Sequence, residues 1–307
     1  MQHNRFLRYV DAVARTGSIR KAAERLNVVS SAVNRRILDI EHEIGTPLFE
    51  RLPRGVRLTP AGEIFVAYIR RQLADEDRAR SEIEDLQGLR RGEVRLAAIE
   101  AMTADFLPRA IADFQRGHPK VAFRTTICGR DEVLERVRNF EADLGLVFSP
   151  PPDPEFRALA EIEQRLCALV APEHPLTRLP KVKLSDCAEY PIAMPDLTLG
   201  GRQLLTVFLA QSSVRLAPAL ESNSFEMMRN FARLSGGVCF QIKIGASSSS
   251  NPAGLVALPL SDRGLPSGKL VVGARRDRVL PVASALFAQH VERALRTASS
   301  LDSPETV

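Results

Sequence analysis

The sequence predicts a multidomain protein with an all-α N-terminal domain, a long linker helix and a two-lobed α/β domain. Apolar residues recur at helical spacing within residues 1–62. Residues 63–91 contain no proline, and glycine only at position 88. From residue 92 to about 300, strand-like and helix-like segments alternate. At 307 residues, the chain is long enough to bury a core in each of these domains.

Positive charge is concentrated at the N-terminus. The first 62 residues hold 11 Lys and Arg against 6 Asp and Glu, and the rest of the chain holds 31 of each. This asymmetry favours a segment that binds a polyanion, although a chance imbalance of surface charge gives the same count. No stretch approaches the roughly 18 apolar residues of a membrane span, and no signal peptide is evident. We therefore expect a cytoplasmic protein that does not bind membranes.

Cysteine and histidine residues are scattered along the chain, which holds four and five of them. Neither residue type shows metal-ligand spacing. We therefore expect buried thiols, no metal and no cofactor.

Three short helices are predicted before residue 45. The first covers residues 5–14, and Ser18 is placed to cap the second, in which two adjacent alanines allow close helix crossing. The third runs from a cap at Ser30 or Ser31 to about Ile44, and Gly45 is its expected stop. Its inward residues are expected to be Val33, Ile37, Ile40 and Ile44.

The opposite face of the third helix carries short polar and cationic groups. They are Ser30, Ser31, Asn34 and Arg35. Free N–H groups at a helix start attract phosphate, while Asn pairs with adenine and Arg with guanine in the major groove. This pattern is typical of a helix-turn-helix, in which one helix braces and the next reads DNA. The plain alternative is the polar outer face of any three-helix bundle.

Residues 47–62, PLFERLPRGVRLTPAG, predict a two-stranded wing. Leu48 and Phe49 are expected to enter the core, and residues 54–55 form a turn. The wing would lie along the DNA backbone or enter the minor groove. Its cationic side chains are Arg51, Arg54 and Arg57.

Several local motifs occur together in residues 3–62: FLRYVDAVARTGS, AAERLNV, SAVNRRI, GTPLFER and RGVRLTPAG. In combination they resemble the winged helix-turn-helix of the LysR-type transcriptional regulators, which implies binding to double-stranded DNA. Residues 29–31 depart from the family, which usually has Ser-Gln-Pro or Ser-Gln-Ser there. Asn34 and Arg36, also a candidate DNA contact, stand where Ser and Gln are common. The base preference of relatives is therefore not carried over.

The linker helix, residues 63–91, has a thin apolar stripe that consists of Ile69, Leu73, Ile83 and Leu86. A long exposed helix of this kind usually requires a partner. The resemblance implies an antiparallel dimer, assembled further into a dimer of dimers, and a roughly palindromic operator.

Residues 92–300 predict two α/β lobes. Strand, helix, strand, helix, strand over residues 92–148 indicates a parallel sheet, and a proline-rich break follows at 149–156. A second α/β set starts at residue 165, and a strand and a helix after residue 267 return to the first lobe. Lobe I is therefore expected at 92–164 and 267–300, lobe II at 165–266, and a tail at 301–307. Residues 245–254 read as a Ser-rich loop.

The cleft between two such lobes is the default ligand site. The motifs LP at 107–108, HP at 118–119, ADLGL at 142–146 and SGGV at 235–238 resemble the family's effector-binding domain. That resemblance implies the type II periplasmic-binding-protein fold and a small-molecule effector. It places the pocket at Glu100, Ala101, Met102, Thr103, Phe148, Ser149, Asp196, Leu199, Asn223 and Ser224.

The chemistry of these residues leaves alternatives open. Thr103 and Ser224, with N–H groups at helix starts, can hold a carboxylate. Glu100 can meet a cation or pair with Arg202, or it is a solvent-facing or helix-capping carboxylate. Phe148 and Met102 line the pocket or pack in the core.

Two other classes of protein fit less well. A solute-binding protein would share the two-lobed fold but not the basic N-terminal domain. An enzyme would need a catalytic set, and the sequence offers no Ser/His/Asp group, phosphate loop or metal constellation. The sequence therefore predicts a transcriptional regulator whose DNA binding is modulated by a small molecule, and not an enzyme.

Overall fold

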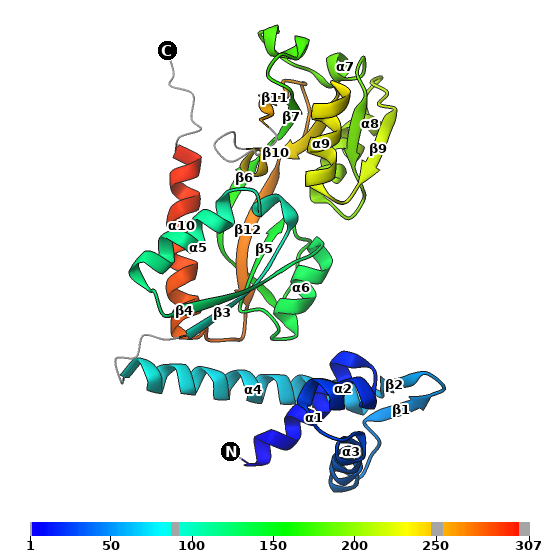
Figure 1. Ribbon diagram of the computed structural model, residues 1–307, viewed down its shortest axis with the longest axis vertical. Coiled ribbons are helices and arrows are strands. Elements are labelled where there is room, and N and C mark those ends of the chain that lie inside the picture. Colours follow the sequence, from blue (N-terminus) through cyan, green and yellow to red (C-terminus); the bar gives the residue numbers. More distant parts are fainter. Residues whose placement is uncertain (1, 87–91, 247–253, 301–307) are drawn as a thin grey trace. The chain divides into compact units, whose positions relative to one another are not determined.

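The computed structural model describes residues 2–86, 92–246 and 254–300 (Figure 1). The chain divides into two units, Met1–Ile83 and Glu84–Val307, which are described in turn.

The first unit consists of four helices and a β-hairpin. The elements are α1 (Gln2–Thr16), α2 (Ile19–Leu26), α3 (Ser30–Ile44), β1 (Phe49–Leu52), β2 (Gly55–Leu58) and α4 (Pro60–Leu86). The inward faces of α1, α2, α3 and α4 share one apolar core, to which Leu48 and Phe49 contribute as predicted. Beside it, the buried carboxylate of Asp11 on α1 accepts a hydrogen bond of 2.9 Å from Nε of Arg70 on α4. This bond joins the first helix to the long one.

The helix ends of this unit follow local chemistry. Ser18 caps α2, since its side chain accepts from the Lys21 N–H, and Gly45 ends α3 at φ 78°; both predictions are confirmed. The prediction that Ser30 or Ser31 caps α3 is wrong. The cap position is Val29, with an extended backbone and no side-chain hydrogen bond, and both serines lie inside the helix. Ile44 is 39% exposed rather than inward, because it is the last residue of the helix.

The wing is an antiparallel pair with Phe49 opposite Leu58 and Leu52 opposite Gly55. The two-stranded wing was predicted, and β1 and β2 form it within an otherwise helical domain. The backbone of Gly55 has φ 113°, and a Cβ there would lie 2.3 Å from the Gly17 carbonyl oxygen. Glycine at this turn therefore allows the wing to approach the end of α1.

The linker helix α4 begins at Pro60, three residues before the predicted start. Of its predicted stripe, Ile69 is fully buried, Leu73 packs on the core, and Ile83 is 56% exposed. The side chain of Leu86 and residues 87–91 lie outside the described part of the chain. Within the first unit, the apolar stripe is thus covered only along its N-terminal half.

The second unit contains two five-stranded sheets. The first has the order β4-β3-β5-β12-β6. Its strands are β3 (Gly92–Ala98), β4 (Val121–Ile127), β5 (Leu144–Phe148), β6 (Phe156–Gln164) and β12 (Gly268–Arg275). Figure 1 shows α6 (Arg130–Arg138) on one side of this sheet and α5 (Phe106–Gly117) with α10 (Val282–Ser300) on the other.

The second sheet has the order β11-β7-β10-β8-β9. Its strands are β7 (Leu166–Val170), β8 (Ile192–Pro195), β9 (Pro218–Ser222), β10 (Val238–Ile242) and β11 (Val256–Pro259). Its helices are α7 (Leu184–Cys187), α8 (Gly200–Ala210) and α9 (Phe225–Ser235). Short 3₁₀ turns complete the unit: η1 (Glu100–Met102), η2 (Pro175–Arg178) and η3 (Lys243–Gly245).

Both sheets are mixed rather than parallel. In the first, β3 is parallel to β4 and β5, but β12 is antiparallel to β5 and β6. In the second, β7 is antiparallel to β10 and β11. The parallel arrangement predicted for residues 92–148 is confirmed by β3, β4 and β5. The antiparallel pairing of β12, which enters the first sheet from the other lobe, was not predicted. Strands β6 and β11 were also missed, since both lie at sheet edges and lack a clean alternation of burial.

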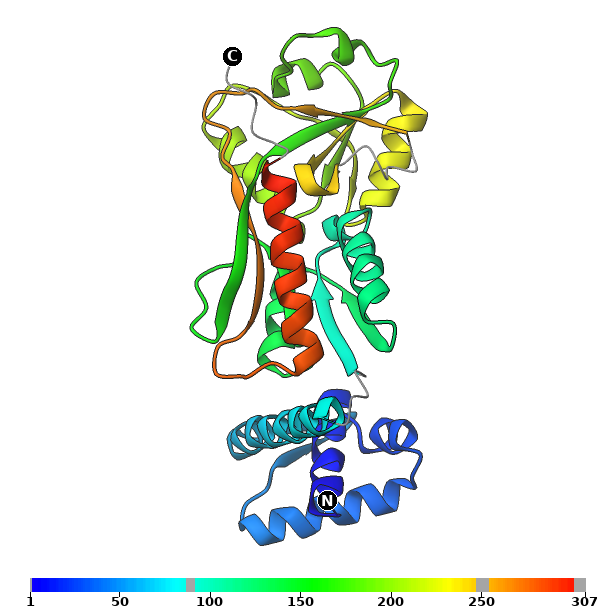
Figure 2. The ribbon, with the colours of Figure 1, turned by 90° about the vertical axis from the view of Figure 1, so that its left-hand side faces the viewer.

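Two crossings join the lobes, one from β6 to β7 and one from β11 to β12, and Figure 2 shows them as long green and orange segments. One apolar core runs through both lobes. Of the predicted Ser-rich loop, residues 247–253 lie outside the described residues. In the described ranges, no helix has the length and apolar character needed to cross a membrane.

Candidate functional site

The face of α3 that was predicted to read DNA is exposed. Ser30, Ser31 and Arg35 are exposed, and Asn34 is half-buried beside them. Val29, at the cap position, makes no side-chain hydrogen bond to the N-terminus of α3. Within the described residues, neither serine has a hydrogen-bond partner for its side chain, and Arg35 has no ion pair. These groups remain available to an outside partner.

The structure separates Arg36 from that face. The guanidinium carbon of Arg36 lies 4.3 Å from the centre of the Phe6 ring on α1. Its Nη1 lies 3.2 Å from a carboxylate oxygen of Asp39. One residue after Arg35, the helix has turned by about 100°, so Arg36 packs on α1 instead of extending beside its neighbour.

Asn34 is joined to the wing. Its Oδ1 accepts a hydrogen bond of 2.8 Å from Nη2 of Arg51 on β1. A second connection lies at the start of the wing, where Oε1 of Glu41 accepts from the N–H groups of Leu48 and Phe49 at 2.7 and 3.0 Å. These bonds hold the wing against α3. Sequence reasoning missed Glu41, whose only signal is a carboxylate near the end of α3 with two unpaired N–H groups seven and eight residues later.

The wing arginines differ in their surroundings. Nη2 of Arg57 donates to Glu50 across the hairpin at 2.7 Å, so one positive charge is partly neutralised. Arg54 lies exposed at the turn, with no ion pair in the described part of the chain. Among the described residues, Arg51 and Arg54 are therefore the wing cations that make no ion pair with a carboxylate.

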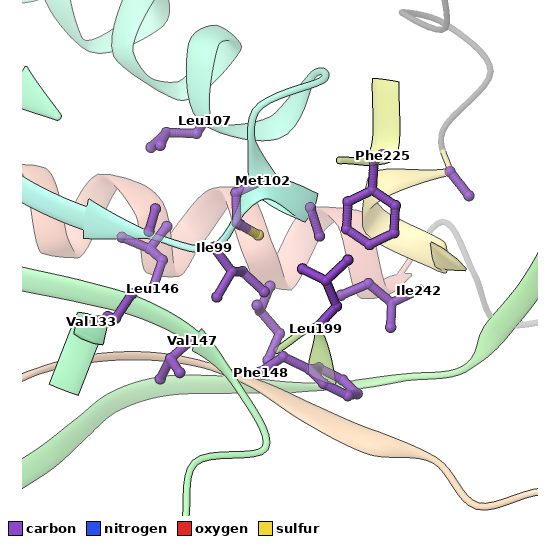
Figure 3. Packing of buried hydrophobic residues seen from close by; sticks show 14 of the residues in the cluster. Ile99, Met102, Leu107, Val133, Leu146, Val147, Phe148, Leu199, Phe225 and Ile242 are labelled. Carbon is purple, nitrogen blue, oxygen red and sulfur yellow. The ribbon is translucent and has the colours of Figure 1, made fainter. Parts of the chain in front are cut away.

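In the second unit, the segment after β3 is mostly buried. Ala101 and Met102 are 3% and 0% exposed, so Met102 packs in the core instead of lining an open pocket. The hydroxyl of Thr103 donates to the Glu100 carbonyl at 2.8 Å and closes the 3₁₀ turn. Figure 3 shows Ile99 and Met102 at this turn, close to Phe225 of the other lobe.

A cavity of about 20 Å³ lies between the lobes, roughly the room for one water molecule. Its lining combines apolar side chains with the N-terminal ends of α6 and α8: Ile99, Ala101, Gly129, Phe148, Thr198, Leu199, Gly200, Gly201, Phe225 and Ile242. Of the predicted pocket residues, Ala101, Phe148 and Leu199 meet here. The cleft is therefore closed and apolar in this structure.

Phe148 lines that cavity and is itself buried. Its side chain is 1% exposed. A Cβ on Gly200 would lie 2.5 Å from Cδ1 of this ring, and a Cβ on Gly268 would lie 2.2 Å from its Cζ. Both glycines thus allow the ring to sit between the lobes, where it packs against both.

Other predicted pocket residues hold local structure. Oδ1 of Asp196 accepts from the N–H and hydroxyl of Thr198 at 2.9 and 2.6 Å, which shapes the turn before α8. Ser149 has φ 44°, and its N–H and hydroxyl both bond to the backbone of Lys269. Asn223 is exposed at the end of β9.

Glu100 makes an interlobe contact. Its Oε1 accepts a hydrogen bond of 2.8 Å from the Phe225 N–H and one of 3.4 Å from the Ser224 hydroxyl, at the start of α9. The helix-capping alternative is therefore confirmed. Pairing with Arg202 is wrong, because Nη1 of that residue donates to the Pro195 carbonyl and Glu221 at 2.8 and 3.1 Å. Burial raises the pKa of Glu100, while hydrogen bonds from α9 and the charge of Arg229 partly oppose that shift.

Arg229 and Gln241 form a buried polar pair that sequence reasoning missed. Arg229 is 8% exposed and Gln241 1%. Nη2 of Arg229 donates to Oε1 of Gln241 at 2.5 Å and to the Gly245 carbonyl at 2.6 Å. Nε of Arg229 and Nε2 of Gln241 have no acceptor among the described residues. The only sequence signal was an arginine within the otherwise apolar face of α9.

Among the described residues, all four cysteines are thiols that form no disulfide. No group of three His, Cys, Asp or Glu side chains there is arranged to hold a metal ion. Burial raises the pKa of Cys187 and of Cys239 to about 12, so both thiols stay protonated at neutral pH.

Two protein families match the sequence. Residues 5–63 match the family described as "Bacterial regulatory helix-turn-helix protein, lysR family". Residues 87–296 match the family described as "LysR substrate binding domain".

Curated relatives cover most of the chain. The RuBisCO operon transcriptional regulator of Allochromatium vinosum is 31% identical over 231 residues, which are 75% of this chain and 76% of the relative. The HTH-type transcriptional regulator CbbR of Rhodospirillum rubrum is 28% identical over 287 residues, 94% of this chain and 95% of the relative.

Solved structures share the fold. A full-length OxyR variant from Pseudomonas aeruginosa has a TM-score of 0.71 at 21% identity and covers 93% of each chain. CbnR in complex with its target DNA has a TM-score of 0.63 at 20% identity and covers 95% of this chain and 99% of that one.

Proposed function

The chain belongs to the LysR family of bacterial transcriptional regulators, and from that premise we propose that α3 and the wing bind promoter DNA under the control of a small molecule in the interlobe cleft. The observation that carries the DNA-binding part is the polar face of α3, on which Ser30, Ser31 and Arg35 are exposed. Beside it lies a wing whose Arg51 and Arg54 make no ion pair within the described residues. The charge excess of the first 62 residues supports the same reading.

The contacts divide by chemistry. Arg35 is the proposed base reader, because a free guanidinium on the exposed face of α3 can pair bidentately with guanine. Ser30 and Ser31 lie at the uncapped N-terminus of α3, which suits phosphate. The wing cations Arg51, Arg54 and Arg57 are proposed to contact the backbone or the minor groove. Arg36, packed on Phe6, is proposed to stabilise the domain rather than to contact DNA.

The linker helix is proposed to mediate self-association. Ile64, Tyr68 and Ile83 on α4 are exposed at 74%, 51% and 56%, and a second copy of α4 would cover such side chains. A dimer presents two wings and therefore favours a roughly palindromic operator, and two dimers can assemble further. The proposed domains remain 1–62, 63–91 and 92–300, with lobes divided near residues 165 and 267.

The effector is proposed to act by separating or reorienting the lobes. The cavity holds roughly one water molecule, so a ligand must displace Phe148 or open the cleft. A ligand that binds the open and closed states unequally shifts their populations, and through the dimer it changes DNA binding. We also propose that the protein works in the cytoplasm, where it binds DNA, and that it is not an enzyme.

The test is fluorescence anisotropy on the intergenic DNA upstream of the protein's own gene, with scrambled DNA as the control, over a series of salt concentrations. We expect salt-dependent binding that is more than about a hundredfold tighter on the intergenic DNA. Binding without preference would direct the search to another promoter. Absence of binding at low salt would contradict the proposal.

A further inference from the structure

The N-terminus of α9 faces lobe I and already holds an anion. The Phe225 N–H donates to Oε1 of Glu100 at 2.8 Å. The Ser224 hydroxyl donates to the same oxygen, while it accepts from the Met227 N–H at 3.4 Å. Free N–H groups and the helix dipole stabilise a carboxylate at this position. The carboxylate in place comes from the opposite lobe, 125 positions earlier in the chain.

Two buried side chains near the Glu100–α9 contact, Arg229 and Gln241, have donor groups without an acceptor among the described residues. Arg229 lies one turn into α9 and is only 8% exposed. Its positive charge is close enough to stabilise the ionised carboxylate of Glu100. Its Nε, and Nε2 of the 1%-exposed Gln241, have no acceptor among the described residues. A buried cation and an unpaired amide are costly unless an oxygen atom completes them. The cluster can therefore serve more acceptor oxygens than Glu100 alone supplies.

We propose that the start of α9 is a carboxylate-binding site of the cleft, that the chain fills it with its own Glu100, and that an effector carboxylate binds there by displacing Glu100. This inference rests on the proposed function of the cleft as the effector site. Without effector, Glu100 links lobe I to α9. With effector, the ligand takes the hydrogen bonds from Phe225 and Ser224, and the link between the lobes is released.

The residues around this site indicate the non-polar part of the ligand as well as its carboxylate. The two groups that hold Glu100, the Phe225 N–H and the Ser224 hydroxyl, are donors. The buried nitrogens without an acceptor among the described residues, Nε of Arg229 and Nε2 of Gln241, are donors as well. The cavity next to them is lined by apolar side chains such as Ile99, Phe148 and Leu199. Donors at one end and an apolar wall at the other suit a small carboxylate with an aliphatic or aromatic body.

The experiment compares melting temperatures of the full chain in sodium acetate and in sodium chloride at equal ionic strength. The variants are Glu100→Ala, which empties the site, and Glu100→Gln, which keeps an acceptor in it. Glu163→Ala, at a carboxylate exposed on β6, is the control for loss of charge. We expect acetate at saturation to raise the melting temperature of Glu100→Ala by about 2–4 °C, and that of the other three proteins by less than about 1 °C.

An equal acetate response in wild type and Glu100→Ala, or none in either, would overturn the proposal. A rise in wild type alone with ethylammonium chloride would also overturn it, because Glu100 would then receive a cation. If Glu100→Ala does not fold, Glu100→Asp withdraws the carboxylate by one methylene group and takes its place. An acetate response in Glu100→Asp that exceeds that of Glu100→Gln supports the site, and equal responses contradict it. DNA is absent from these measurements, so failure of the proposed DNA binding would be seen separately by anisotropy.

Discussion

The α3–wing surface and the interlobe cleft keep their polar groups in opposite states. On α3, Ser30, Ser31 and Arg35 are exposed and unpartnered within the described residues. In the cleft, Glu100 is hydrogen-bonded to α9, and Phe148 occupies the space between the lobes. Exposed groups stay hydrated in the folded chain, so they need no internal partner. Groups in a closed cleft lose water on folding, so they must find partners within the chain.

Substitution of Phe148 should break this comparison most strongly. Phe148→Ala removes a ring that is 1% exposed, and we expect it to lower the free energy of unfolding of the α/β unit by about 3–5 kcal/mol. Denaturant unfolding followed by circular dichroism measures the loss. Leu197→Ala, at a side chain that is 70% exposed, is the control and should cost less than about 0.5 kcal/mol. A loss for Phe148→Ala below about 1 kcal/mol would mean that the ring does not fill the cleft.

On the α3 side, Arg35→Ala should affect binding and leave stability unchanged. Loss of a bidentate base contact should weaken specific DNA binding by about 1–3 kcal/mol, roughly 5- to 150-fold. Arg54→Ala is the matched control, because a backbone contact should weaken specific and scrambled DNA alike and reduce the salt slope by about 1. Anisotropy on both DNAs measures these effects. Equal losses on the two DNAs for Arg35→Ala would remove its base-reading role.

The contact between Asn34 and Arg51 offers a sharper test of the same surface. If Asn34 positions Arg51, the double variant should bind DNA about as weakly as Arg51→Ala alone. We expect a coupling free energy of about 0.5–1 kcal/mol in a double-mutant cycle of DNA binding with Asn34→Ala and Arg51→Ala. Additive effects would instead indicate that Asn34 contacts DNA independently.

The pH dependence of Glu100 should give the smallest effect. Because burial raises its pKa in the folded state, folded wild type takes up a proton at a higher pH than the unfolded chain does. The free energy of unfolding of wild type should therefore increase, relative to Glu100→Gln, as the pH falls from 7 towards the ordinary value of 4.5. Urea unfolding of both proteins over this range measures the difference. A relative decrease would show that the hydrogen bonds from α9 outweigh burial.

Part of the architecture could be predicted because it follows from local chemistry. The cap at Ser18, the stop at Gly45 and the wing with its turn before Gly55 each depend on a few neighbouring residues. Strand β6 was missed because an edge strand shows no regular alternation of burial, and its pairing with β12 joins segments about a hundred residues apart. The antiparallel pairing of β12 with β5 was not predicted for the same reason, because it joins segments far apart in the chain.

The sequence by itself determined the order of elements, the basic N-terminal domain and the set of polar groups on α3, since periodicity, turn chemistry and charge are properties of short segments. Only the tertiary structure decided that Arg36 packs on Phe6, that Asn34 holds Arg51, and that Glu100 caps a helix of the other lobe. Each of these is a contact between elements, and its partner depends on how distant segments pack. The same carboxylate could have faced solvent, a ligand or Arg202, and the position of α9 selected among them.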